Sequence, residues 1–316
     1  MFFPLGCGAN ASTEALNIHV MYPFGGLGDR SFADTVYAGI VKAGTEVNLS
    51  EDQAVPSDID NAREIFRAWT STPAKGPELI ILVGFTYAQL ITESSCDFLG
   101  RDVVLLDASV PSCPHLAYHI YRTFSPSFLA GVAAMQVSQR HAAAVIGGMS
   151  IATVNEFVRG FKAGVEYAGG TVTTVEYLSE TEDGFTDPEK AAEVATRLYE
   201  SADVIFPVAG GSGQGVFEAA EAADDRYVIG VDSDQAWMGR GIVIGSVVKR
   251  LDSSVVESVR EVDSGKFQPG GHILGMADNG VDFLVNDVFA DRVGNAVEGA
   301  RESALTAGVA DLQENP

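Results

Sequence analysis

Short apolar runs alternate along the chain with longer segments in which apolar residues recur at helical spacing. Residues 79–83 and 103–106 are continuous apolar runs, a pattern typical of buried parallel strands, and residues 16–21 form a short, mainly apolar run that predicts the first strand. Residues 31–43 and 58–69 instead place apolar side chains three and four positions apart, which predicts helices. This alternation of strands and helices predicts an α/β protein with parallel sheets.

The pattern restarts after a break near residues 122–126. Further strands are predicted at residues 142–146, 172–177, 204–206, 228–231 and 242–248. Two such series predict two doubly wound lobes, the first of residues 16–122 and 249–276, the second of 123–248 and 277–316. Ligands of open parallel sheets bind beyond the carboxyl ends of the strands. Two facing lobes therefore predict a hinge and a ligand-binding interlobe cleft.

The net charge of the chain excludes some classes of binding partner. The 316 residues include 43 acidic and 20 basic side chains, for a formal net charge of −23. Nucleic-acid binding requires a basic face, so we expect no nucleic-acid partner, and the acidic surface opposes docking on anionic lipid headgroups. The three cysteines and five histidines lack the spacing of a zinc site, so we expect no metal.

The cysteines raise two further questions. Residues 2–6 are mainly apolar and lead to Cys7, and residues 8–14 are small and mainly polar. This order resembles the end of a bacterial lipoprotein signal, so we interpret residues 1–15 as a signal remnant and tether with Cys7 as the lipidated residue. The alternative is an incidental thiol in a frayed terminus.

Cys96 and Cys113 flank one short strand, and we expect two unrelated thiols, although an oxidising compartment would allow a bridge.

Several polar or aromatic residues follow predicted strands. Phe32 and Asp34 lie in the stretch after the first strand and are candidate ligand-binding residues, although Phe32 faces either the core or the cleft. Asp107 and Asp232 each follow a strand, and a carboxylate there suits a ligand that presents N–H or O–H groups, although a loop cap is the alternative for Asp107. Lys249 ends a later strand and either reaches the same cleft or is a solvated surface lysine.

A glycine-rich turn follows the strand at residues 204–206. It contains Gly210, Gly211, Gly213 and Gly215, and such a turn lets a ligand approach the backbone closely. A dinucleotide fingerprint is the competing interpretation, but its third glycine stands one residue too early for the G-x-G-x-x-G spacing. Neither a P-loop nor a nucleophile-elbow motif is present.

At these positions the sequence resembles the basic membrane protein family, which includes purine nucleoside receptors of ABC transporters. The resemblance extends from about residue 18 to residue 289 and rests on the order and spacing of several segments. These segments are GGLGDRSF at 25–32, IGGM at 146–149, FVRGFKAG at 157–164, VAGGSGQGVF at 208–217, GVDSDQ at 230–235 and SVVKR at 246–250.

The resemblance implies an extracytoplasmic substrate-binding lipoprotein with a type I periplasmic-binding-protein fold, anchored to the membrane only by lipid and working with an ABC permease. By position, Phe32 and Phe206 would sandwich the base of a nucleoside, and Asp107 would bind its polar edge. Asp232 and Lys249 would hold the ribose hydroxyls.

The family pattern also sets limits. Ala33 stands where family members usually carry Asn, so a side-chain contact is lost and the base preference is open. We expect no cofactor and no catalytic residue. The alternatives are the same fold with a sugar or another small polar ligand, and a nicotinamide-dependent or nucleoside-cleaving enzyme. The misspaced glycines and the lack of an evident catalytic set argue against the enzyme.

Overall fold

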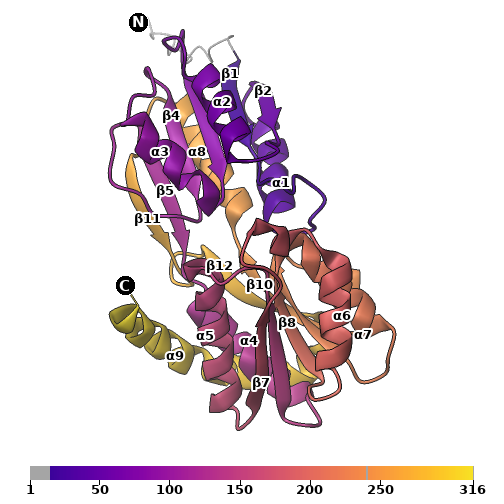
Figure 1. Ribbon diagram of the computed structural model, residues 1–316. Coiled ribbons are helices and arrows are strands. Elements are labelled where there is room, and N and C mark those ends of the chain that lie inside the picture. The colour runs from indigo at the N-terminus through magenta and orange to yellow at the C-terminus, as the bar shows by residue number, and fades with distance from the viewer. Residues whose placement is uncertain (1–14, 240, 316) are drawn as a thin grey trace, which may run out of the picture.

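The computed structural model describes residues 15–239 and 241–315, which form two α/β lobes, one above the other in Figure 1. Cys7 and most of the proposed tether lie outside the described residues. The two predicted doubly wound lobes are confirmed. No helix among the described residues is both long and apolar enough to span a membrane.

The first lobe is built on a six-stranded parallel sheet in the order β11-β5-β4-β3-β1-β2. Its strands are β1 (Leu16–Met21), β2 (Leu49–Ala54), β3 (Glu78–Val83), β4 (Asp102–Leu106), β5 (Leu116–Tyr121) and β11 (Gly270–Leu274). Its helices are α1 (Phe32–Gly44), α2 (Ile59–Trp69), α3 (Ala88–Ser94) and α8 (Leu251–Asp263). Helices α1 and α8 contribute to the core on one face of the sheet, and α2 and α3 to the core on the other. Strands β3 and β4 are apolar after their first residue because both faces of the sheet are covered.

The second lobe repeats this plan in the order β12-β10-β9-β8-β6-β7. Its strands are β6 (Ala142–Gly147), β7 (Thr171–Tyr177), β8 (Val204–Val208), β9 (Tyr227–Asp232), β10 (Val243–Lys249) and β12 (Val281–Val285). Its helices are α4 (Phe124–Val137), α5 (Ala152–Tyr167), α6 (Pro188–Leu198), α7 (Gly213–Glu221) and α9 (Ala290–Glu314). All its strand pairs are parallel except β10 with β12.

The chain passes between the lobes three times, after β5, after β10 and between β11 and β12. Two backbone hydrogen bonds tie these crossings together: Arg122 N–H donates to the Leu274 carbonyl at 2.9 Å, and Arg250 N–H to the Gly280 carbonyl at 2.8 Å. Three adjacent connections of this kind form the hinge of a two-lobed protein. Lys249, which the sequence assigns to the segment returning to the first lobe, is the last residue of β10 in the second lobe.

The structure corrects the expectation for two of the cysteines. Cys96 and Cys113 form a disulfide, with their Cα atoms 5.6 Å apart, within the usual range for a bridge. Cys96 lies just after α3, and Cys113 lies in the loop between β4 and β5. The chain folds back between these positions, so two residues that flank a strand in sequence meet in space.

Candidate ligand-binding site

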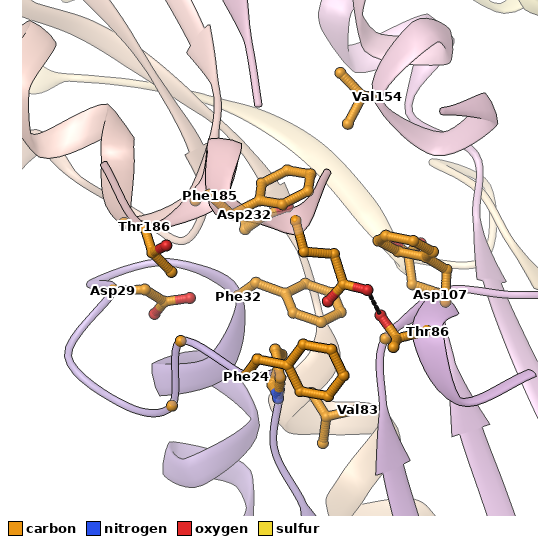
Figure 2. A pocket seen from close by; sticks show the side chains of 18 of the residues that line it. Phe24, Asp29, Phe32, Val83, Thr86, Asp107, Val154, Phe185, Thr186 and Asp232 are labelled. Carbon is orange, nitrogen blue, oxygen red and sulfur yellow. Dashed lines mark hydrogen bonds between the residues drawn. The ribbon is translucent and has the colours of Figure 1, made fainter. Parts of the chain in front are cut away.

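A cavity of about 600 Å³ lies between the lobes and is lined by residues at the carboxyl ends of strands from both sheets. Figure 2 shows side chains that line it. Its walls combine aromatic rings, carboxylates, hydroxyls and glycine backbone. Its lining includes Phe24, Asp29, Phe32, Phe85, Thr86, Asp107, Phe157, Glu182, Asp183, Phe185, Gly210, Gly211, Gln214, Asp232 and Lys249. The volume and the mixture of apolar and polar walls suit a small polar molecule with a flat apolar part.

A buried charged cluster joins the lobes at this cavity. The Lys249 Nζ atom lies 2.7 Å from Asp107 Oδ2 and 3.7 Å from Asp232 Oδ1. These three residues are only 4–7% exposed. Burial alone would lower the pKa of the Lys249 ammonium, but the nearby carboxyls of Asp107, Asp232 and Glu156 outweigh burial and raise this pKa. Lys249 therefore stays charged, and among the described residues that line the cavity it is the one cationic side chain.

Asp107 and Asp232 occupy equivalent places in the two lobes, at the carboxyl ends of β4 and β9. Both have left-handed backbone, with φ of 64° and 63°. Residues other than glycine seldom adopt this conformation, although aspartate tolerates it better than most, and it is often found at functional sites.

The two carboxylates differ in their hydrogen bonding. Asp107 Oδ2 accepts a hydrogen bond from Lys249. Asp232 Oδ2 lies 3.1 Å from the Ser31 hydroxyl, which is also 3.1 Å from the Val231 carbonyl. Asp232 Oδ1 is buried without a hydrogen-bond partner. A buried acceptor of this kind is costly unless something donates to it, so it fits a ligand hydroxyl.

Aromatic rings flank the lysine. Its ammonium lies 5.4 Å from the centre of the Phe32 ring and 4.9 Å from that of Phe157, within cation–π range. Phe32 begins α1 in the first lobe, and Phe157 belongs to α5 in the second. The open question about Phe32 is answered: its half-buried ring lines the cavity. Figure 2 shows it with Phe24 and Phe185 beside the cavity.

The structure does not place Phe206 at the cavity. Phe206 is fully buried in the core of the second lobe, with its ring centre 5.1 Å from that of Phe161 and 6.0 Å from that of Phe157. Strand β8 continues through Pro207 to Val208, so Phe206 is an interior strand residue that faces the helices. The second lobe presents Phe185 to the cavity instead.

The loop before α1 is held by two carboxylates with different positions. Asp34 accepts hydrogen bonds from the Gly28 and Arg30 amides and does not line the cavity, so it shapes the loop. Asp29 lines the cavity and accepts hydrogen bonds from the amides of residues 31, 33 and 34 at the start of α1. Burial raises the pKa of Asp29 to about 6, although these amides act in the opposite direction.

The glycine-rich turn contributes Gly210 and Gly211 to the lining. Gly210 has a positive φ of 51°, which favours glycine. Gly215 lies farther along, in α7, where an added Cβ would collide with the Pro188 carbonyl of α6. The later glycine thus serves helix packing, and the earlier ones border the cavity.

Two single-turn helices face each other across the cavity, and the residues they carry were missed from sequence. Helix η1 (Phe85–Tyr87) follows β3, and η2 (Glu182–Phe185) lies between β7 and α6. Thr86 of η1 donates a hydrogen bond to Glu182 of η2 at 2.7 Å, and the rings of Phe85 and Phe185 lie 6.5 Å apart.

Other hydrogen bonds also join the lobes. The Gln214 amide donates to the Gly28 carbonyl at 3.1 Å. The Arg30 carbonyl accepts from Ser233 at 2.9 Å and from Gln235 at 3.0 Å. These contacts on several sides of the cavity define a closed conformation.

Comparisons with known proteins identify the family of the chain. The family described as ABC transporter substrate-binding protein PnrA-like matches residues 15–309. The ABC transporter nucleoside-binding protein BmpA of Lactococcus lactis is 26% identical over 287 residues, which cover 84% of this chain and 80% of that protein. Basic membrane protein B of Borreliella burgdorferi is 30% identical over 227 residues, 70% of this chain and 63% of that protein.

The fold agrees with solved structures as well. A solute-binding protein of an ABC transporter system from Aeropyrum pernix K1 superposes with a TM-score of 0.78 at 23% identity, covering 95% of this chain and 90% of that chain. With its two parallel-sheet lobes, its interlobe cavity and a family match over nearly its whole length, the chain belongs to the PnrA-like family of ABC transporter substrate-binding proteins.

Proposed function

We propose that this substrate-binding protein is a receptor for nucleosides, purine nucleosides above all, and that it performs no chemistry on them. The observation that carries the proposal is the combination of aromatic rings with a buried Asp–Lys–Asp cluster in one cavity. A nucleoside has a flat base that stacks on rings and a ribose whose hydroxyls both donate and accept hydrogen bonds.

The ribose fits the charged cluster. Asp232 Oδ1 is a buried acceptor without a hydrogen-bond partner, and the Lys249 ammonium 3.7 Å away is a donor. Neighbouring hydroxyls of a ribose can donate to the first and accept from the second. Asp107 fixes the position of Lys249 from the other lobe, so its role is to orient the lysine at least as much as to meet the ligand.

The base fits the aromatic part of the cavity. Phe32 from the first lobe is one stacking surface, and Phe185 takes the stacking role that the family resemblance implied for Phe206. Stacking contributes roughly 1–3 kcal/mol per base, and hydrogen bonds to charged groups about 1.5–3 kcal/mol each. After the costs of association, a binding free energy near about −8 kcal/mol, or micromolar affinity, is attainable.

The charge of the cavity argues against phosphorylated ligands. Asp29, Asp107, Glu182, Asp183 and Asp232 line it together with one lysine, and that lysine is already paired. A nucleoside monophosphate would bring additional negative charge into this acidic site. We therefore expect nucleotides and dinucleotides to bind more weakly than nucleosides.

The relative from Lactococcus lactis supports the proposal because its name describes a nucleoside-binding protein. A lipoprotein among the relatives, from Pyrococcus abyssi, supports the proposed anchor on Cys7. In this account the protein is tethered outside the cytoplasm and delivers its ligand to an ABC permease.

A thermal-shift panel on protein stripped of ligand tests the proposal. Ligands that bind only the folded state raise the melting temperature in proportion to affinity and concentration. We expect purine nucleosides to raise it in a dose-dependent way, and glucose, galactose and arabinose to leave it unchanged. A shift with a sugar and none with any nucleoside would overturn the proposal in favour of a sugar receptor. Conversion of a nucleoside during incubation would indicate an enzyme.

A further inference from the structure

The facing turns η1 and η2 both present an aromatic ring and polar side chains to the cavity. Helix η1 contributes Phe85 and Thr86, and η2 contributes Phe185 with the carboxylates of Glu182 and Asp183. Glu182 and Phe185 belong to the same single helical turn and both line the cavity, so a carboxylate and a ring on which a base can stack lie on one wall. The charged cluster around Lys249 does not involve either turn.

Glu182 keeps most of its capacity to accept hydrogen bonds. A carboxylate offers about four acceptor positions on two oxygens. Thr86 uses one position on Oε1 at 2.7 Å, marked by the dashed line in Figure 2. Glu182 is half-buried, and burial raises the pKa of its carboxyl, partly offset by the hydrogen bond from Thr86. Its second oxygen has no partner among the hydrogen bonds and ion pairs of the described residues, so it can meet a ligand donor.

The chemistry of the base edges then decides which base fits. Guanine presents two adjacent donors in one plane, N1–H and the 2-amino group, which match the two oxygens of a carboxylate. Adenine presents its 6-amino donor beside the N1 acceptor, and uracil presents N3–H between two carbonyl acceptors. A carboxylate cannot donate, so an acceptor placed opposite its second oxygen is repelled.

We propose that Glu182, held by Thr86, is a specificity-determining residue that favours guanine over adenine in the bound nucleoside. This inference rests on the proposed nucleoside function and identifies the part of the same cavity that recognises the base. Hypoxanthine keeps N1–H but lacks the 2-amino group, so inosine falls between guanosine and adenosine.

Calorimetric titration of stripped protein with guanosine, inosine and adenosine tests the inference. The wild-type chain should bind guanosine at least about 10-fold more tightly than adenosine, the lower end of the range for hydrogen bonds to a charged group, with inosine between them. The substitution Glu182→Gln keeps the shape but replaces one acceptor oxygen with a donor. It should reduce the guanosine preference to about 3-fold or less, mainly by weakening guanosine.

Glu180→Gln is the matched control, because Glu180 is an exposed glutamate two residues earlier that does not line the cavity, and it should preserve the preference. Equal affinity of the wild-type chain for guanosine and adenosine, or equal weakening of both by Glu182→Gln, would overturn the role of Glu182 and leave nucleoside binding intact. If no nucleoside binds the wild-type chain, the proposed function itself fails. The comparison of the three nucleosides on the wild-type chain requires no variant to fold.

Discussion

The two lobes share a strand order but contribute different chemistry to the cavity. Strands β1 to β5 in the first lobe correspond to β6 to β10 in the second, and the fourth strand of each series leads to an aspartate in left-handed conformation. The fifth strands differ. β5 ends in Tyr121, whose hydroxyl donates to Ser254 within its own lobe, whereas β10 ends in Lys249, which pairs with Asp107 of the other lobe.

This difference shows how a repeated scaffold makes an asymmetric site. Equivalent backbone positions bring Asp107 and Asp232 to the same cavity, and a single lysine from one lobe turns two carboxylates into an ordered cluster. The Asp107 carboxylate accepts a hydrogen bond from Lys249, whereas the Asp232 carboxylate has a buried oxygen without a hydrogen-bond partner.

Removing the lysine should have the largest effect. Lys249→Met leaves Asp107 and Asp232 buried without their cation, and breaking a buried ion pair costs about 3–5 kcal/mol of unfolding free energy. Urea denaturation should show this loss, and calorimetry should show no nucleoside binding. Lys162→Met is the matched control, since Lys162 pairs only loosely with Glu166 at the surface, and it should change stability by less than about 1 kcal/mol. A Lys249→Met chain that unfolds and binds like the wild type would contradict the role of the cluster.

Two phenylalanines of the second lobe should separate folding from binding. Phe206→Ala opens a cavity in the core and should destabilise the protein by about 3–5 kcal/mol, with the affinity of the folded fraction unchanged. Phe185→Ala should preserve folding and weaken nucleoside binding by about 1–3 kcal/mol. Urea midpoints and calorimetry on both variants measure the two effects. The opposite assignment of effects would place the base at Phe206 after all.

The disulfide should stabilise the first lobe and leave the second lobe unaffected. Cys96 and Cys113 lie in the first lobe, 17 residues apart, and residues 123–248 contain no cysteine. Cys96→Ser with Cys113→Ser should destabilise the first lobe by about 3 kcal/mol, because an open loop gains entropy in the unfolded chain. Hydrogen exchange should become faster in β3 to β5 and stay unchanged in β6 to β9. Reductant added to the double variant is the control and should have no effect; uniform acceleration in both lobes would contradict the assignment.

Substitutions of Asp107 and Asp232 should differ in whether they weaken ligand binding or stability, and this is the smallest of the expected effects. Asp232→Asn removes the charge from the carboxylate with the buried free acceptor and should weaken nucleoside binding by about 1.5–3 kcal/mol with little change in stability. Asp107→Asn should act mainly on stability, because Asp107 holds Lys249. Measuring both quantities for both variants tests the division of roles, and identical profiles would show that the two lobes contribute equivalently.

Part of the site could be predicted from the sequence, because ligands of open parallel sheets bind beyond the carboxyl ends of the strands. Asp107, Asp232 and Lys249 follow or end apolar runs, and parallel sheets bring such positions to one edge, so their meeting required no knowledge of side-chain packing. The residues that follow β3 could have been predicted as site residues in the same way, since Phe85 and Thr86 come directly after Gly84 at the end of that strand.

Other features had no local signal. The strand predicted at residues 204–206 continues through Pro207 to Val208 in the structure, which places Phe206 inside β8 and in the core. Glu182 and Phe185 lie several residues beyond β7, and only the folded path of that loop brings them to the cavity. The pairing of Cys96 with Cys113 depends equally on the course of the chain between α3 and β5.

If the charged cluster holds a ribose, a nucleoside must bind more tightly than its free base, and calorimetry of the two ligands measures this difference. A closed cavity leaves Asp232 poorly paired when the ribose is missing. Stripped protein should bind inosine with micromolar or tighter affinity and hypoxanthine at least about 10-fold more weakly, and Asp232→Asn should erase most of that difference. Equal affinity for inosine and hypoxanthine on the wild-type chain would contradict the account.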